Sequence, residues 1–270
     1  MEGVLFSLTI YLQRLYYPIV SLGSLYVSLK SIMPIVYKLL DVLENEKEIK
    51  SGRYYPTIPL QGHIDMRNIY FKYEDSSCYI FKGFDLEIAQ GEIVGIIGKN
   101  GSGKTSIIRM LTRLCTPESG EILLDGTDIS LYSVEYLNKH IGIMSQDNYL
   151  PGWELREIFE CNDESDEEKI CVLLRYLNFS IGNFTKGLKS KIGENKMSLS
   201  GGEIQKIAFI RLISQNRQIY IMDEPSSALD GDSENRMIHL IDKYLIGKTC
   251  MIITHRKAIL EICDRVVELR

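Results

Sequence analysis

Residues 95–106 read GIIGKNGSGKTS, and this stretch decides the fold. It satisfies the pattern GxxxxGK[ST], and it follows an apolar run typical of a strand and opens a run typical of a helix. Glycines let backbone N–H groups surround phosphates, the lysine brings a positive charge to the β- and γ-phosphates, and the threonine hydroxyl can ligate Mg²⁺. The stretch therefore predicts a phosphate-binding loop for a Mg-nucleotide. Its pattern residues are Gly98, Gly101, Gly103, Lys104 and Thr105.

Short β-rich runs alternate with helical patterns on both sides of this loop. Several of these runs are apolar without interruption, which suits strands buried on both faces of a sheet. Helical patterns at 104–115 and 233–245 lie between them, so we expect a mainly parallel sheet flanked by helices. LDGT at 124–127 predicts a tight hairpin turn. The strands are expected at 63–73, 92–98, 121–129, 141–146, 218–224, 249–255 and 265–270.

The composition of the 270 residues is that of an ordinary globular protein, with 45% hydrophobic and 25% charged residues. A formal net charge of -5 argues against a general nucleic-acid-binding protein, which needs a basic surface. The six cysteines lack CxxC or CxxH spacing, so neither a zinc site nor a disulfide framework is expected. An acidic run at 162–169 predicts a solvated helix start, because Ser165 and Glu168 have capping-box spacing.

The first part of the chain has a different composition. Residues 3–43 are mostly apolar and aromatic, and residues 44–59 then turn polar and contain prolines, which indicates a domain boundary. The order of features that marks a secretory leader is not found here. Because Arg14 splits the apolar stretch, we expect no complete membrane span. An amphipathic helix packed on a soluble core and a membrane-derived helix remain equally open.

Two carboxylates and a histidine follow later strands. In QIYIMDEP, Asp223 ends an apolar run where phosphate-loop proteins hold the Mg²⁺ shell, and Glu224 follows as a base for the attacking water. Two adjacent carboxylates at a buried strand end repel each other unless a cation offsets their charge. His255 in ITHR ends the next apolar strand, at the same sheet edge, and is expected to sense the γ-phosphate.

A glycine pair also begins a later helix. In SLSGGEIQK (198–206), two glycines and a preceding serine stand at the start of the helical pattern IQKIAFIRLISQ. Backbone N–H groups exposed at such a helix start can bind an anion. The sequence therefore contains a second expected anion site, a hundred residues after the phosphate loop.

From about residue 64 to residue 270 the chain resembles the nucleotide-binding domain of ATP-binding cassette (ABC) transporters. The resemblance implies an α/β fold of the P-loop NTPase type: a mainly parallel sheet core, an antiparallel β subdomain and an inserted helical lobe at about 147–215, preceded by an N-terminal helix. It rests on six motifs in the family's order. These are the phosphate loop at 98–105, Gln146 in MSQD, LSGGE at 199–203, the pair Asp223 and Glu224, SALD at 227–230, and His255.

The resemblance also implies ATP and Mg²⁺ as ligands. Tyr73 in FKYED matches the family's aromatic that stacks on adenine, a contact typically worth about 1 to 3 kcal/mol. The other expected ATP contacts are Gly98, Lys99, Asn100, Gly101, Ser102, Gly103, Lys104, Thr105, Ser106 and Gln146. The expected Mg²⁺ ligands are Thr105, Gln146 and Asp223. The expected catalytic residues are Glu224, His255 and Lys104.

In ABC proteins two such domains pair head to tail, and each signature helix faces the γ-phosphate bound by the other chain. The resemblance therefore implies a homo- or heterodimer in which four residues contact the partner's ATP: Ser200, Gly201, Gly202 and Asp230. This signature departs from the common LSGGQ, because Glu203 stands at its fifth position. A carboxylate pointing at a triphosphate is unfavourable, so we expect Glu203 to point away and leave the serine and glycine contacts intact.

The front segment, GVLFSLTIYLQRLYYPIV, is similar to the end of the last transmembrane helix of ABC exporters. Gly193 and Glu194 resemble an exporter-specific loop ahead of the signature, although residues 195–197 lack the usual glycine. The resemblance thus implies the C-terminal part of an exporter half-transporter. Residues 1–57 would be helix remnant and linker, and residues 58–270 the ATP-binding domain. The expected partners are a second nucleotide-binding domain and an exporter's transmembrane domain, at the cytoplasmic face of a membrane, with no nucleic acid.

Three classes of function remain open at this stage. The leading one is an ATPase that drives export through ATP-dependent pairing. A soluble ABC-type ATPase working on DNA or ribosomes would need a long coiled-coil insertion or a second cassette, and neither is found in these 270 residues. A regulatory module that holds ATP without turnover would be expected to lack Glu224 or His255, and both are here.

Overall fold

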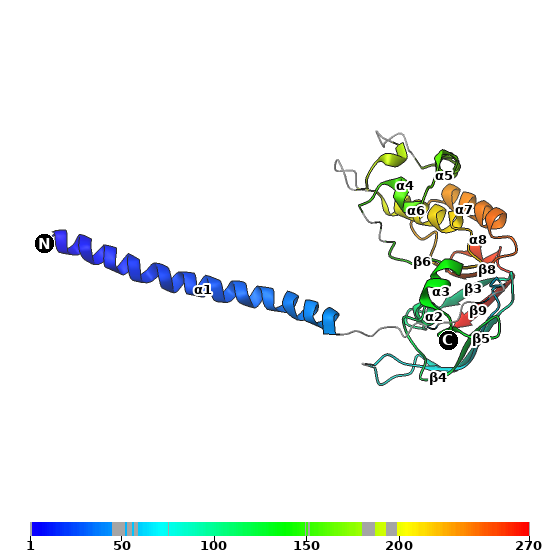
Figure 1. Cartoon of the computed structure of the whole chain (residues 1–270), viewed down its shortest axis with the longest axis horizontal. Helices are drawn as coiled ribbons and strands as arrows, with labels where there is room; N and C mark the ends of the chain where they lie inside the picture. The colour runs from blue at the N-terminus through cyan, green and yellow to red at the C-terminus, as the bar shows by residue number, and fades with distance from the viewer. Residues whose placement is uncertain are drawn as a thin grey trace. The chain divides into compact units, whose positions relative to one another are not determined.

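The structure is a computed structural model, and it divides the chain into two units, residues 1–48 and 49–270 (Figure 1). The residues that the structure describes are 2–44, 52, 56, 59–74, 76–148, 150, 152–179, 187–192 and 199–269. The expected exporter-specific loop with Gly193 and Glu194 lies outside them.

The first unit is one continuous helix, α1 (Glu2–Glu44), with Pro18 and Pro34 inside it. The described side chains from Ile10 to Leu40 are exposed although most are apolar. Among the described residues, this segment is the one helix long and apolar enough to cross a membrane, by length and composition. The segment meets the length and composition of a span with Arg14, Lys30 and Lys38 inside it, so Arg14 does not by itself exclude a complete span.

The core of the second unit is a five-stranded sheet in the order β6-β7-β8-β3-β9, and all four strand pairs are parallel. Because the strands are parallel, their carboxyl ends lie at one edge of the sheet. β3, β8 and β7 are successive neighbours, so the ends of these three strands lie side by side. The bounds are β3 (Ile93–Gly98), β6 (Ile141–Met144), β7 (Ile219–Asp223), β8 (Thr249–Ile253) and β9 (Arg265–Leu269).

The two central strands are buried on both faces, which explains their unbroken apolar runs. In β7, Ile219 and Ile221 belong to one hydrophobic core, whereas Tyr220 and Met222 belong to another. β8 alternates in the same way, with Met251 in the first core and Cys250 in the second. The parallel sheet predicted from the sequence is confirmed.

A second sheet is antiparallel, in the order β2-β1-β4-β5. Asp125 (φ 49°) and Gly126 (φ 77°) form the two-residue turn between β4 and β5, as LDGT predicts, because such a turn requires positive φ at both positions. β2 was not among the predicted strands. Its sequence FKGFDLEI mixes apolar and polar residues instead of forming an apolar run. The bounds are β1 (Ile64–Phe71), β2 (Phe81–Ile88), β4 (Ser119–Leu124) and β5 (Thr127–Asp128).

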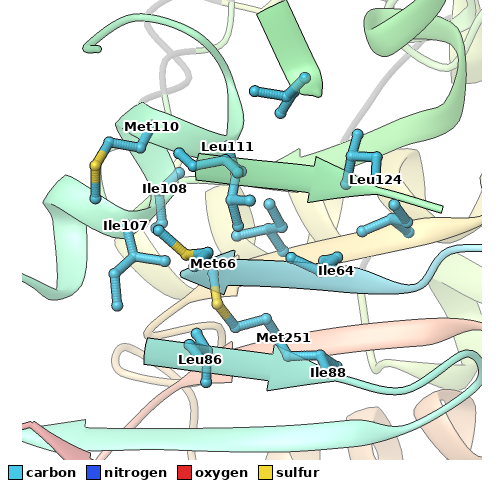
Figure 2. Packing of buried hydrophobic residues seen from close by; sticks show 14 of the residues in the cluster. Ile64, Met66, Leu86, Ile88, Ile107, Ile108, Met110, Leu111, Leu124 and Met251 are labelled. Carbon is cyan, nitrogen blue, oxygen red and sulfur yellow. The ribbon is translucent and has the colours of Figure 1, made fainter. Parts of the chain in front are cut away.

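Figure 2 shows the core that joins this antiparallel sheet to the helix after the phosphate loop. Met66 from β1 and Leu86 from β2 lie in one buried cluster with Ile107 and Leu111 of α2 (Lys104–Leu111) and with Met251 of β8. This packing fixes the first turn of α2, and with it the end of the phosphate loop.

Most helices between β6 and β7 gather around the second core (Figure 1). The helix of the acidic run begins at Glu164 and is capped by Asp163, whose side chain accepts the N–H of Asp166. The expected cap at Ser165 is therefore wrong, because Asp163 supplies the cap two residues earlier and Ser165 already lies inside the helix. The helix bounds are α3 (Val134–His140), α4 (Leu155–Ile158), α5 (Glu164–Tyr176), α6 (Gly201–Ser214), α7 (Gly231–Tyr244) and α8 (Lys257–Leu260), with short 3-10 turns η1 (Ile129–Leu131) and η3 (Gly187–Lys189).

Candidate active site

The phosphate loop connects β3 to α2. Gly103 occupies the N-cap position of α2 with φ 96°, and no side chain caps the helix. The first N–H groups of α2 thus point into the loop without a side-chain partner, which is the arrangement that binds anions. A Cβ at Gly103 would collide with the ring of Phe81 and with Cγ2 of Ile80, whereas a Cβ at Gly101 would meet open space.

Lys104 folds back across its own loop. Its Nζ donates hydrogen bonds to the backbone carbonyl oxygens of Gly98 (2.5 Å) and Lys99 (3.0 Å). These carbonyls hold the ammonium group over the loop, so its charge is already placed where phosphate oxygens would arrive. Gly98 and Lys99 therefore act on the site through their backbone, and Ser102, within the loop, has a buried hydroxyl with no protein partner among the described residues.

Asp223, at the end of β7, is a buried carboxylate with 7% of its surface exposed. Burial raises the pKa of Asp223, and the neighbouring Glu224 and Asp147 raise it further, while Lys104 lowers it. A raised pKa means that the charged form lacks full compensation in the protein alone. A divalent cation would supply that compensation, so the donor set fits a Mg²⁺ site.

Glu224 follows in a strained backbone conformation, with φ 49°. Its N–H donates to the carbonyl of Ile253 at the end of β8 (2.8 Å), and its Oε2 accepts from Oγ1 of Thr254 (3.4 Å). A non-glycine residue at positive φ persists only when its surroundings hold it there. The side chain of Glu224 is thereby directed to the edge where β3, β7 and β8 end.

One cavity of about 310 Å³ collects most of the predicted ATP, Mg²⁺ and catalytic residues. Gln146 and His255, exposed beyond the ends of β6 and β8, lie on its wall. Ile80 also lines it and was not predicted. The predicted residues on its wall are Tyr73, Asn100, Gly101, Gly103, Lys104, Thr105, Ser106, Gln146, Asp223, Glu224 and His255. Those that do not line it are Gly98, Lys99, Ser102, Ser200, Gly201, Gly202 and Asp230.

Tyr73 lies at the cavity wall beside α2. Its hydroxyl is 3.1 Å from Oγ of Ser106 and accepts a hydrogen bond from Arg109 (3.2 Å). The Arg109 guanidinium also lies over the Tyr73 ring, 5.6 Å from its centroid, and Phe71 packs edge-on at 5.1 Å. Sequence reasoning missed Arg109, although its position three residues after Ser106 places both on one face of α2.

The signature residues form a separate cluster. Ser200 caps α6, and the Cβ positions of Gly201 and Gly202 face the backbone and side chain of Ala228 in the SALD loop. Asp230 caps α7 by accepting the N–H of Ser233 (2.8 Å), and this bond lowers its pKa. Ser200, the two glycines and Asp230 do not line the cavity that contains the phosphate loop.

The side chain of Glu203 folds back onto Ser200. Its Oε2 accepts the backbone N–H of Ser200 (2.8 Å) and the Ser200 hydroxyl (2.7 Å). In return, the Glu203 N–H donates to Oγ of Ser200 (3.3 Å), which completes a capping box. The N3 carboxylate of a capping box folds back toward its N-cap residue, and Glu203 does so here. That Glu203 points away from the partner's phosphates stays a prediction.

A buried amide that sequence reasoning missed links the signature helix to Glu224. Gln205 of α6 donates through Nε2 to the Glu224 carbonyl (3.2 Å) and to Oγ of Ser227 (2.7 Å). Its Oε1 accepts the N–H of Ala228 (2.9 Å). Only its burial, which the sequence pattern does not reveal, distinguishes it from a surface glutamine.

A phosphate loop between β3 and α2, with carboxylates at the end of a neighbouring parallel strand, defines a P-loop nucleotide-binding protein. Residues 81–227 match the ABC transporter family. The chain belongs to the ABC transporter family, and the residues that match the family lie in its second unit.

Similar proteins support this assignment. The leukotoxin export ATP-binding protein LtxB of Aggregatibacter actinomycetemcomitans is 32% identical over 269 residues, covering 98% of this chain and 38% of LtxB. The leukotoxin translocation ATP-binding protein LktB of Mannheimia haemolytica is 33% identical over 254 residues, covering 93% of this chain and 36% of LktB. A bacterial Atm1-family ABC exporter with ATP bound superposes with a TM-score of 0.75 at 26% identity, covering 96% of this chain and 46% of the exporter. The chain thus spans less than half the length of each.

Proposed function

We propose that this chain is the ATP-binding and ATP-hydrolysing part of an ABC exporter, which couples head-to-tail pairing of two ATP-binding domains to transport across a membrane. The observation that carries the proposal is the single cavity that joins the phosphate loop to Asp223, Glu224 and His255. The relatives support export, because the names of LtxB and LktB and the solved Atm1-family structure all describe export or translocation proteins.

Each residue of the cavity has a distinct task in hydrolysis. The loop N–H groups and the Lys104 ammonium neutralise the β- and γ-phosphates, and Gln146 contacts the γ-phosphate side. Glu224 orients and polarises the attacking water, and His255 steadies the γ-phosphate as charge develops on it. Because Glu224 and His255 both lie at the cavity wall, the arrangement favours turnover over passive ATP holding.

Mg²⁺ is proposed as the metal cofactor, held by Thr105, Gln146 and Asp223 directly or through water. Bound by these residues, Mg²⁺ would offset negative charge on the phosphates. Asp223 supports this assignment most strongly, because its buried carboxylate has a raised pKa and faces the cavity. A cation would restore the balance of charge that the protein alone leaves incomplete.

Tyr73 is proposed to bind the adenine base. Arg109 lies over its ring and donates to its hydroxyl, which fixes the orientation of the ring. Adenine would stack against the ring from the cavity side, where Ile80 adds an apolar contact. The nucleotide then extends from Tyr73 across the phosphate loop to Glu224.

The pairing part of the proposal rests on Ser200, Gly201, Gly202 and Asp230. These residues do not line the cavity of their own chain, so a second chain is needed if they are to contact ATP. A complete site would thus contain the phosphate loop of one chain and the signature helix of another. The partner is proposed to be a second ATP-binding domain, identical or related.

The membrane part of the proposal rests on α1. Its exposed apolar segment is long enough to span a bilayer, and Ser21, Ser24 and Ser31 direct their hydroxyls to carbonyls of the preceding turn. Hydroxyls satisfied inside the helix suit an apolar environment. We assign residues 1–57 to a remnant of a transmembrane helix and its linker, and residues 58–270 to an ATP-binding domain at the cytoplasmic face of the membrane.

Two variants test the catalytic assignment. Glu224→Gln should keep ATP binding but lower turnover by about 10² to 10⁴, the usual effect of losing a general base. Lys104→Ala should instead weaken ATP binding, because it removes charge before chemistry begins. ATP affinity is measured with a fluorescent nucleotide and turnover by phosphate release. Wild-type turnover in Glu224→Gln would refute the base, and unchanged affinity in Lys104→Ala would refute the phosphate contact.

A further inference from the structure

In the first turn of α6, a hydrogen bond from Ser200 to Glu203 bears on the pairing of two chains around ATP. The hydroxyl of Ser200 has one hydrogen, and it is donated to the Glu203 carboxylate over 2.7 Å. The same carboxylate oxygen accepts the Ser200 N–H over 2.8 Å. Hydrogen bonds to an ionised acceptor are roughly twice as strong as neutral ones. In this state the signature serine therefore has no hydrogen left to offer a phosphate.

We propose that Glu203 determines how readily this chain pairs around ATP, because it competes with the partner's γ-phosphate for the Ser200 hydroxyl and repels that phosphate. The inference rests on the proposed function, in which Ser200 contacts ATP held by a second chain. It assigns Glu203 to that pairing step: the carboxylate at the fifth signature position disfavours the closed pair.

The geometry sets the size of the effect. A phosphate oxygen that took the same hydroxyl hydrogen would lie about 2.7 Å from Oγ, at the usual O–H···O distance. The carboxylate oxygen lies at 2.7 Å from the same atom. The charges of the Glu203 carboxylate and of the phosphate are then within about 5 Å of each other. At that distance, by Coulomb's law, their repulsion weakens the pairing roughly 4-fold under water-like screening and more than 100-fold at an effective dielectric constant near 20. Since Ser200 is exposed and Glu203 is half-buried, we expect the pairing to be weakened by an amount between these limits and nearer the lower one, about tenfold.

Glutamine at this position would keep the fold and remove the competition. Its side-chain oxygen can still accept the Ser200 N–H, as in the S/T-x-x-E/Q capping box. It carries no charge, so the hydroxyl is free to turn toward a phosphate. Glu203→Gln thus changes the chemistry of the signature without removing the cap.

The chain contains a matched control in a second capping box. At the start of α4, Glu157 accepts the Glu154 N–H over 2.9 Å, in the same N3-to-N-cap geometry. Glu157 has no contact with the signature serine in the described structure, and it does not line the ATP cavity. Glu157→Gln therefore repeats the loss of one carboxylate charge from a capping box in the same domain.

The experiment measures ATP-driven pairing of the full chain in detergent with Mg²⁺, in a Glu224→Gln background that slows hydrolysis. Light scattering over a range of ATP concentrations gives the midpoint of dimerisation, and a fluorescent nucleotide gives the ATP affinity of the monomer. Glu203→Gln should lower the midpoint about tenfold and leave the monomer affinity unchanged. Glu157→Gln should change neither value.

The outcomes separate this inference from the proposed function. An unchanged midpoint in Glu203→Gln, or an equal shift in Glu157→Gln, would overturn the role of Glu203 while leaving the ATPase proposal standing. A Glu203→Gln chain that stays monomeric although ATP saturates it would overturn the inference and the head-to-tail pairing together. Pairing by Glu203→Gln at ATP concentrations where the parent stays monomeric supports both. Failure of the parent to bind ATP at all would refute the proposed function itself.

Discussion

Replacing Gln205 by methionine tests whether the signature helix positions the catalytic carboxylate. Methionine has nearly the same length as glutamine, so the buried volume is conserved, but it cannot form the three hydrogen bonds of the amide. The change removes the donor to the Glu224 carbonyl, the donor to Ser227 and the acceptor for the Ala228 N–H. The Glu224 carbonyl keeps a longer bond from the Ser227 N–H, at 3.3 Å.

These contacts set the expected losses of stability and of kcat in Gln205→Met. A hydrogen bond contributes about 0.5 to 1.5 kcal/mol net, so three give about 1.5 to 4.5 kcal/mol. Ser227 and Ala228 are exposed and can turn to water, which favours the lower part of that range. At about 2 to 4 °C per kcal/mol for a domain of this size, 1.5 to 3 kcal/mol lowers Tm by roughly 3 to 12 °C. Misplacement of a catalytic group by about 1 Å can lower the rate 10²-fold, so we expect kcat to fall about 10- to 100-fold.

ATP affinity is the readout that separates positioning from general damage. Gln205 does not line the ATP cavity, so Kd for ATP should stay close to that of the wild-type chain. Gln218→Met is the matched control, because Gln218 also bridges two groups, the Gln61 carbonyl (2.9 Å) and the Lys248 ammonium (3.2 Å), but at the opposite end of β7. It should lower Tm and leave kcat within about a factor of two, a change too small to indicate lost transition-state contacts. If Gln205→Met turned over ATP as fast as Gln218→Met, the positioning role would be refuted.

Three further predictions follow from the same structure. Asp223→Asn should raise Tm without nucleotide at neutral pH, because the raised pKa of Asp223 means that folding penalises the charged carboxylate. The penalty develops between the ordinary pKa of aspartate and the raised folded pKa and is complete above the latter, so the gain should vanish below the ordinary pKa, and stabilisation by Mg-ATP should be lost. Thermal unfolding across pH, with and without Mg-ATP, measures both, and no gain at neutral pH would contradict the burial argument. Gly103→Ala should destabilise the domain by about 2 to 4 kcal/mol, because residue 103 has φ 96° and the new Cβ would collide with Phe81. The Cβ of Gly101→Ala meets open space, so this variant should cost about 1 kcal/mol. Urea unfolding measures both free energies, and equal losses would count against the packing explanation. Deleting residues 1–57 should improve solubility and leave ATP affinity nearly unchanged, because the exposed apolar side chains of the first unit are removed; a large fall in affinity by fluorescent-nucleotide titration would place that segment in the nucleotide-binding unit.

The centre of the parallel sheet could be predicted because β7 and β8 are buried on both faces. Such strands are continuous apolar runs, and they stand out from the rest of the chain. The strand β2 (Phe81–Ile88) could not be found in this way, because only some of its residues face the core. It is also an edge strand that pairs with β1 alone, so its position depends on a partner rather than on its own pattern.

The residues that line the cavity could be predicted because the chemistry requires particular residue types at fixed spacing. Lys104 and Asp223 are far apart in sequence, yet both follow parallel strands, and parallel strands bring such residues to one sheet edge. The contact of Glu203 with Ser200 follows the S-x-x-E spacing of a capping box, so the sequence contained a signal for it. The burial of Gln205 could not be predicted from spacing, because it depends on hydrogen bonds across to the Glu224 loop.

The first turns of α6 therefore have two faces with different tasks. Glu203 and Gln205 are two residues apart, about 200° around a helix, so their side chains leave on nearly opposite sides. Gln205 is buried against the Glu224 loop of its own chain, whereas Ser200, held by Glu203, is exposed toward solvent. In the proposed pair, the exposed face would contact the partner's ATP while the buried face holds the base for the chain's own ATP. A displacement of α6 on pairing would then reach the carbonyl of Glu224 through a single amide, which gives the two ATP sites a direct physical route by which to influence each other.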